Sequence, residues 1–372
     1  MTLSDVLAAL GVVLNGIPQA LLAATYGFAS VPTAFGFVVG AVACLLYGSV
    51  IPISFQAETI ALAGMLGKDI RERLSIILFS GITMVILGLT GTLSIIVDFA
   101  GSTIINAMMA GVGIMLARIA LGGLKESRIV TASSIVSAFI TYFFFGQNLV
   151  YTIVVCVIFS SLVANIFKIN FGGGIIENYK KIEIKKPIIN LSVIRGALAL
   201  ACLTIGANIA FGNITASMTG KYEANIAFGN ITASMTGKYE ANIDHLTIYS
   251  GLADAVSSLF GGGPVEAIIS ATAAAPNPLT SGVLMMVIMA VILFFGLLPK
   301  ISKYIPGHSV HGFLFILGAI VTVPTNASLA FSGGTPQDYV VAATAMTVTA
   351  ANDPFIGLLV ALVVKYIFVF IG

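Results

Sequence analysis

Long apolar stretches, separated by short polar or glycine- and proline-containing breaks, run through the whole chain. Seven stretches precede a polar linker at about residues 168–191, and seven follow it. A helix that crosses a bilayer needs about 20 predominantly apolar residues. The pattern predicts an all-α polytopic membrane protein with about 14 transmembrane segments, the first seven in residues 1–167 and the last seven in residues 192–372.

The individual segments follow from hydropathy and from the positions of glycine and proline. Before the linker we expect segments at 5–29, 31–50, 52–67, 73–92, 94–122, 128–146 and 148–167. After it we expect segments at 193–219, 247–260, 263–275, 279–299 and 305–323, and two more within 338–371.

The third segment of each half is short and begins at a break. Residues 52–67 begin at a proline, and residues 263–275 follow the run Gly-Gly-Gly-Pro at 261–264. Paired, interrupted short segments at corresponding positions are typical of a transporter whose site lies between inverted repeats. Backbone groups freed at such breaks need partners from protein or a water-filled cavity. The pair predicts a substrate site where the third and tenth segments meet. Two kinked or re-entrant helices that bind nothing are the alternative.

Composition supports a membrane protein and excludes several classes of function. Hydrophobic residues make up 58% of the chain and charged residues 9%, whereas soluble domains carry about 25% charged residues. The net charge is +2, and no basic stripe points to a nucleic-acid partner. The three cysteines show no paired spacing, so neither a disulfide framework nor a zinc site is expected. We expect a multi-pass protein of the cell (plasma) membrane.

One stretch of 17 residues is repeated without change. ANIAFGNITASMTGKYE occupies 207–223 and recurs at 224–240. Solenoid repeats drift in sequence and need at least three copies to bury a core, so this is not an architectural repeat. The first copy completes a spanning helix, and the second copy is expected to be an insertion outside the membrane.

Ionisable residues at membrane depth are costly and are therefore functional candidates. Glu266 lies two residues after the break at Pro264, and Glu58 lies in the matching segment of the first half. Asp254 and Glu266 are also weaker candidates for coupling transport to an ion. For each of the three, a purely structural carboxylate is the alternative.

Neighbouring residues complete the predicted substrate site. Gln56 can donate and accept hydrogen bonds together, Gly263 and Val265 flank the second break, and Asn213 lies in the eighth segment. Signatures of ATP hydrolysis, of zinc proteases and of nucleophilic catalysis are not found in the sequence. We therefore expect no enzyme activity and no cofactor.

Several stretches resemble one family of transporters. LADAVSSLFGGGPVEAIISATAA (252–274) resembles the region around the ninth and tenth segments of the nucleobase–cation symporters (nucleobase/ascorbate transporters), closest to the adenine/guanine/hypoxanthine permease branch. PTAFGFVVGAVACLLYG (32–48), AMMAGVGIMLARIAL (107–121) and TAANDPFIGLLVALVVKYI (349–367) are similar to their counterparts in order and spacing.

The resemblance implies a 7+7 inverted repeat with a core domain (segments 1–4 and 8–11) and a gate domain (segments 5–7 and 12–14). It places Glu266 at the substrate-binding glutamate of that branch. The branch carries an acidic residue in its eighth segment, where FGNITAS (211–217) has Asn213 instead. Proton coupling through that helix is therefore in doubt.

The expected function is secondary active transport of nucleobase-like substrates such as purines, by alternating access and driven by a proton or sodium gradient. Partners would be the substrate, the coupling cation, the lipid bilayer and, as an open alternative, a second copy in a homodimer. An anion or carboxylate (sulfate-type) transporter on the same fold is the main alternative, and a transport-inactive membrane protein is another.

Overall fold

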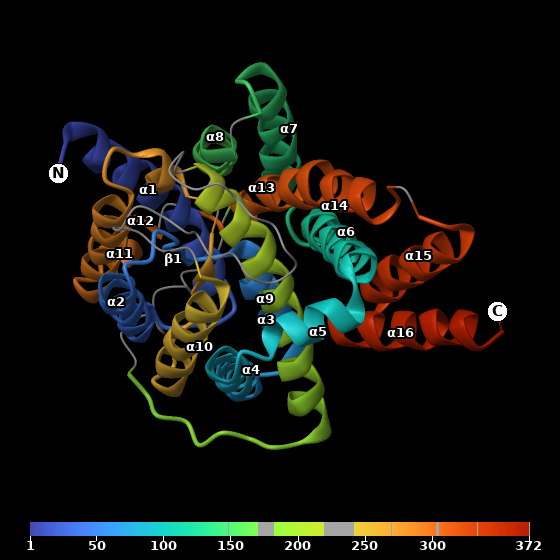
Figure 1. Cartoon of the computed structure of the whole chain (residues 1–372). Coiled ribbons are helices and arrows are strands. Elements are labelled where there is room, and N and C mark those ends of the chain that lie inside the picture. The colour runs from blue at the N-terminus through green and yellow to red at the C-terminus, as the bar shows by residue number, and fades with distance from the viewer. Residues whose placement is uncertain are drawn as a thin grey trace. The chain divides into compact units, whose positions relative to one another are not determined.

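The computed structural model describes residues 1–147, 149–169, 182–218, 242–268, 270–302, 305–332 and 334–371. The repeated insertion at 224–240 lies outside the described residues, as does half of the linker, residues 170–181. Nearly all of the described chain is helical (Figure 1).

Most of the helices follow the predicted segments, but the segment predicted at 94–122 forms two helices, and the one predicted at 263–275 is mostly non-helical. Those of the first half are α1 (Leu3–Thr25), α2 (Ser30–Tyr47), α3 (Ala57–Leu66), α4 (Ile70–Thr90), α5 (Leu93–Ala100), α6 (Ser102–Glu126), α7 (Arg128–Phe144) and α8 (Leu149–Ile166). Those of the second half are α9 (Leu191–Met218), α10 (Ile243–Leu259), η2 (Ala271–Ala274), α11 (Pro278–Phe294), α12 (Leu297–Ser302), η3 (Gly307–Val310), α13 (His311–Phe315), η4 (Ile316–Thr322), α14 (Val323–Ala330), α15 (Pro336–Ala351) and α16 (Pro354–Ile371). Two short strands, β1 (Ile53–Ser54) and β2 (Glu266–Ala267), lie in the two broken segments.

The chain divides into two compact units, each assembled from both halves of the sequence. The first unit comprises residues 1–94 and 172–304, and the second comprises residues 95–171 and 305–372. This division confirms the predicted core domain, with segments 1–4 and 8–11, and the predicted gate domain, with segments 5–7 and 12–14. Both broken segments belong to the first unit.

Close helix contacts hold the first unit together. Helix α10 packs along α4 and α2, and α11 packs against α2 and α1 (Figure 1). A Cβ atom built at Gly81 of α4 would lie 2.5 Å from the carbonyl oxygen of Gly251, and one at Gly251 would lie 2.6 Å from that of Gly81. Glycine at both positions therefore lets the two helix backbones approach, as small residues do in membrane bundles.

Small side chains also dominate the second unit. Helix α6 packs against α13, α14, α15 and α16, and Ala107, Ala342, Ala345 and Ala361 form part of one buried cluster there. The helix from His311 to Ala330 contains a π-helical stretch at Ile316–Thr322, just before Pro324. A π-helical bulge is a common way for a helix to accommodate a local disruption of its hydrogen bonds.

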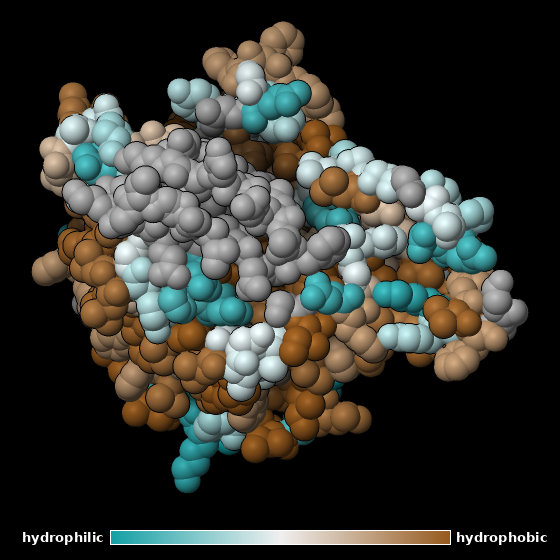
Figure 2. Space-filling view, in the orientation of Figure 1, coloured by the Kyte–Doolittle hydropathy of each residue, from teal (hydrophilic) through white to brown (hydrophobic). Residues whose placement is uncertain are grey.

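Hydropathy and surface both confirm a multi-pass membrane protein. Among the described residues, six helices are long and apolar enough to cross a bilayer. Large apolar side chains are exposed on the outside of many helices, including Leu46 at 79% and Phe144 at 82%. Figure 2 shows hydrophobic residues covering much of the outer surface over α2 and α11. Such broad apolar surfaces are not tolerated in water and face lipid instead.

Candidate functional site

The two broken segments pass each other within the first unit. After α2 ends, Gly48 adopts a left-handed conformation and the chain runs extended through β1 before α3 begins. After α10 ends, Gly261 has a φ of +101°, and the chain runs extended through Pro264 into β2. Strands β1 and β2 pair antiparallel, with Ile53 opposite Ala267 and Ser54 opposite Glu266.

This register places Ser54 and Glu266 side by side. Residues directly opposite each other in an antiparallel pair project to the same face, with Cβ atoms about 4.5–5.5 Å apart. Gln56 is still extended, with φ −126° and ψ 121°, so two residues beyond Ser54 it continues on that face. The pairing thereby brings together polar residues from the two broken segments.

Glu266 is buried and only half satisfied. Glu266 is 1% exposed. Its Oε1 accepts a hydrogen bond of 2.7 Å from the hydroxyl of Thr204 in α9. Oε2 has no hydrogen-bond partner among the described residues. The carboxyl of Asp254 interacts with that of Glu266, but two carboxylates share a hydrogen bond only when one carries a proton.

Two unpaired hydrogen-bonding groups face the site from the first broken segment. Ser54 and Gln56 are 1% and 3% exposed, and neither Ser54 Oγ nor Gln56 Nε2 has a partner among the described residues. Gln56 Oε1 accepts a hydrogen bond from Thr59. The Gln56 side chain does not cap the start of α3, where the Glu58 carboxyl interacts with its own backbone N–H.

The freed backbone groups at the breaks find partners on two neighbouring helices. The N–H of Val265 donates to Asp254 Oδ1 at 2.7 Å, and the hydroxyl of Ser257 donates to the Gly263 carbonyl at 2.6 Å. The Gly263 N–H donates to Thr33 Oγ1 of α2 at 2.8 Å. In the first broken segment, the Tyr249 hydroxyl donates to the Ile51 carbonyl at 2.5 Å.

The predicted site residues take different places in this arrangement. Glu266 lies opposite Ser54 in the paired strands, Gln56 lies two residues beyond Ser54, and Glu58 is buried in the first turn of α3. Gly263 contributes its backbone alone to contacts with α10 and α2. The Val265 side chain packs toward α2, because a Cβ atom at Gly36 would lie 2.8 Å from Val265 Cγ2.

In the eighth segment, Thr204 is the residue that contacts Glu266. Asn213 lies in α9, but its side chain is outside the described part of the chain. Thr204, nine positions earlier, is the residue bonded to Glu266, and Asn208 is one turn further along. Asn208 Nδ2 donates to Thr247 and Ser250 of α10 at 3.4 and 3.3 Å, while its Oδ1 has no partner among the described residues.

Sequence reasoning therefore missed Ser54 and Thr204. Thr204 and Asn208 are four residues apart and lie on one face of an otherwise apolar helix, which is a usable signal. Ser54 carries no comparable signal, because a single serine in an apolar segment is common.

The buried charged residues of the first unit are all acidic. Glu58, Asp254 and Glu266 are all buried, whereas no lysine or arginine among the described residues is buried. An unpaired buried carboxylate is strongly unfavourable. Among the described residues these carboxyl groups have no buried cationic side chain to pair with.

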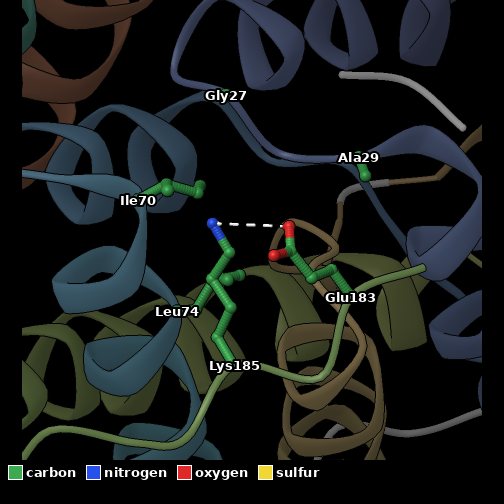
Figure 3. Close-up of a pocket in the computed structure, with 7 residues that line it drawn as sticks. Gly27, Ala29, Ile70, Leu74, Glu183 and Lys185 are labelled. Carbon is green, nitrogen blue, oxygen red and sulfur yellow. Dashed lines mark ion pairs between the residues drawn. The ribbon is translucent and has the colours of Figure 1, made fainter. Parts of the chain in front are cut away.

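A separate small cavity lies away from the paired strands. It is lined by Gly27, Ala29, Ile70, Leu74, Glu183, Lys185 and Gly261 (Figure 3). Lys185 Nζ lies 3.7 Å from Glu183 Oε2, and both side chains are partly exposed. An exposed ion pair of this kind contributes little stability. None of the paired-strand residues lines this cavity, so we assign it no part in the substrate site.

Comparison with solved structures places the fold among known transporters. The transmembrane domain of the cyanobacterium bicarbonate transporter BicA matches with a TM-score of 0.67 and 14% identity over 97% of each chain. The murine Solute Carrier 26 family member A9 (Slc26a9) anion transporter in the inward-facing state matches with a TM-score of 0.68 and 12% identity, over 99% of this chain and 68% of that one. No protein-family model matches the chain, and no curated protein matches it in sequence.

These matches correct the predicted family. Membership in the nucleobase–cation symporter family is wrong, because the solved structures that match the whole chain are described as bicarbonate and anion transporters. The stretches that carry the resemblance include the helix break at 261–264 and many small residues. They identified the fold, which is confirmed, and carried no information about the substrate. The chain is similar in fold, over nearly its whole length, to membrane proteins that transport anions.

Proposed function

We propose that this protein is a secondary transporter of a small anion, with its substrate site at the paired strands β1 and β2. The observation that carries the proposal is the cluster of unpaired, buried donors there. Ser54 Oγ and Gln56 Nε2 lack partners among the described residues, and the Gln56 side chain does not cap the start of α3. Helix N-termini with free N–H groups favour anionic ligands. Buried donors without partners are costly, and a bound oxyanion would satisfy them.

Glu266 and Glu58 repel an anion unless their charge is offset. We therefore propose that a cation, either a proton or Na⁺, binds with the anion and neutralises the carboxylate of Glu266. Glu266 Oε2 and Asn208 Oδ1 are buried oxygens without partners, and hard cations take oxygen ligands. Transport of the anion would then depend on the cation gradient.

The proposed role of each site residue follows from its position in the paired strands and the neighbouring helices. Ser54, Gln56 and the start of α3 would bind the anion, and Glu266, oriented by Thr204, would bind the cation. Glu58 would be a second carboxylate at the anion-binding end of α3. Asn213, Gly263 and Val265 remain proposed neighbours of the site. Because both broken segments belong to one compact unit, movement of that unit could carry the whole site between the two sides of the membrane.

Uptake by proteoliposomes tests the proposal. Labelled bicarbonate, sulfate and oxalate would be offered in turn, with an inward Na⁺ gradient, an inward proton gradient or neither. We expect saturable uptake of at least one anion, stimulated by one of the gradients. A hydrogen bond to a charged group contributes about 1.5–3 kcal/mol, so Gln56→Leu should raise the KM for the anion about 10- to 100-fold.

Ser258→Ala provides the matched control. The Ser258 hydroxyl is buried but bonds only within α10, to the carbonyls of Asp254 and Ala255, so its removal should leave KM within about twofold. Absence of saturable anion uptake under every gradient would refute the proposal and favour a transport-inactive protein on this fold.

A further inference from the structure

Helix α10 forms hydrogen bonds to both broken segments. Tyr249 bonds the first broken segment at the Ile51 carbonyl, while Asp254 and Ser257 bond the second one at Val265 and Gly263. These three residues are at most 1% exposed. Each bond satisfies a backbone group that a helix break would otherwise leave unpaired.

The second broken segment is also held by α2, through the Thr33 hydroxyl at the Gly263 N–H and the Ala29 N–H at the Gly261 carbonyl. It has no side-chain anchors of its own from Gly261 to Pro264, and its pairing with β1 covers only two residues. Asp254 and Ser257 are three residues apart and so lie on the same face of α10. Together they fix an N–H and a carbonyl that are two residues apart, immediately before Glu266.

We propose that Asp254 and Ser257 are positioning residues, which hold the 263–265 backbone so that the Glu266 side chain projects beside Ser54, and that Glu266 alone is the cation-binding carboxylate. This inference rests on the proposed function for its transport readouts. It replaces the predicted coupling role of Asp254 with a role as hydrogen-bond acceptor.

A substitution at Asp254 can distinguish a positioning role from a role in binding the cation. Asp254 accepts from the Val265 N–H and also interacts with Glu266. An asparagine keeps an acceptor oxygen for Val265 and presents an amide N–H to the Glu266 carboxylate. Asp254→Asn should therefore preserve the positioning, whereas it would abolish any role that needs Asp254 to bind a proton or a cation.

Transport by Asp254→Asn, Asp254→Leu and Glu266→Gln is the first test. We expect Asp254→Asn to keep its KM for the anion within about threefold of the wild type and to keep the stimulation by the cation gradient. Glu266→Gln should lose that stimulation. Asp254→Leu, which lacks the acceptor, should raise KM at least tenfold, as expected for loss of a charge-assisted bond. Loss of gradient stimulation in Asp254→Asn would overturn the inference, because Asp254 would then carry the coupling.

Ser257 and Ser258 give a second test that does not depend on replacing a charge. Both are buried serines in the last turn of α10, but only the Ser257 hydroxyl reaches the broken segment. Ser257→Ala should raise the KM for the anion about two- to tenfold, the effect of one neutral hydrogen bond, while Ser258→Ala should not. Equal effects of the two substitutions would contradict a positioning role for Ser257.

Hydrogen–deuterium exchange supplies a readout that is independent of transport. In the purified protein, the peptide covering 261–268 should exchange faster in Asp254→Leu than in the wild type, and at the wild-type rate in Asp254→Asn. Peptides from α6 serve as the internal reference. Unchanged exchange in Asp254→Leu would overturn the inference even in a transport-competent protein. If the wild type transports no anion, the proposed function fails, and the exchange experiment still decides the positioning role.

Discussion

The contact between α4 and α10 gives a quantitative prediction about what holds the site-bearing unit together. A Cβ atom at Gly81 would lie 2.5 Å from the Gly251 carbonyl oxygen and 3.0 Å from the Ala255 nitrogen. Favourable contacts between such atoms begin at about 3.5 Å, so Gly81→Ala requires the two backbones to separate by about 1 Å. Overpacking of this kind costs about 1–3 kcal/mol.

Gly11→Ala is the matched control for this substitution. Gly11 also lies inside a helix of the same unit, and a Cβ atom there would meet nothing within 4 Å. Both substitutions gain about 1 kcal/mol from the higher helix propensity of alanine. The difference between the two variants therefore isolates the overpacking cost of about 1–3 kcal/mol.

Apparent melting temperature in detergent measures that difference. We expect Gly81→Ala to melt several degrees below Gly11→Ala, and Gly11→Ala to melt at or slightly above the wild type. Because α10 holds both broken segments, Gly81→Ala should also reduce anion uptake. If Gly81→Ala proves as stable as Gly11→Ala, then the two backbones are not in contact as the structure has them.

Three further outcomes test other parts of the account. Thr204→Val removes the donor to Glu266 Oε1 and should reduce gradient-driven uptake tenfold or more. Thr90→Val should not, because the Thr90 hydroxyl is exposed and bonds only to residues next to it in the sequence, at Ile86, Leu87 and Thr92. Asp5→Ala leaves the N–H groups of Asn277 without the carboxylate that accepts them at 2.8 and 2.9 Å, and should lower the melting temperature by an amount equivalent to about 1–3 kcal/mol. Deletion of 224–240 should leave uptake and melting temperature unchanged, and a loss of either would show that the repeated insertion is required.

Much of the fold could be predicted because glycine and proline residues mark the helix breaks in the sequence. Gly261 and Pro264 end α10 and open the second broken segment, and the matching segment of the first half follows Pro52. The predicted helix boundaries were wrong where a helix break lay inside an apolar stretch. The predicted segment at 94–122 is in fact a short helix, α5, followed by α6, because Gly101 adopts a φ of +83°. Hydropathy averages over such a residue and cannot detect it.

The site could be predicted only in part because its residues come from distant parts of the chain. Glu266 and Gln56 are signalled by the adjacent breaks. Their alignment with Ser54 depends on the register of β1 and β2, and the bond from Thr204 depends on how α9 packs. Neither is set by local sequence. The predicted substrate class was wrong because it rested on a resemblance at the breaks, whereas the solved structures that match the whole chain are described as bicarbonate and anion transporters.

Anion uptake as a function of the imposed cation gradient, in the wild type and in Glu266→Gln, tests the central claim most directly. The account predicts that wild-type proteoliposomes accumulate an anion faster under an inward Na⁺ or proton gradient, and that Glu266→Gln transports it at a rate independent of either gradient. Gradient-stimulated uptake that persists unchanged in Glu266→Gln would contradict the claim that the paired strands bind the anion and its coupling cation together.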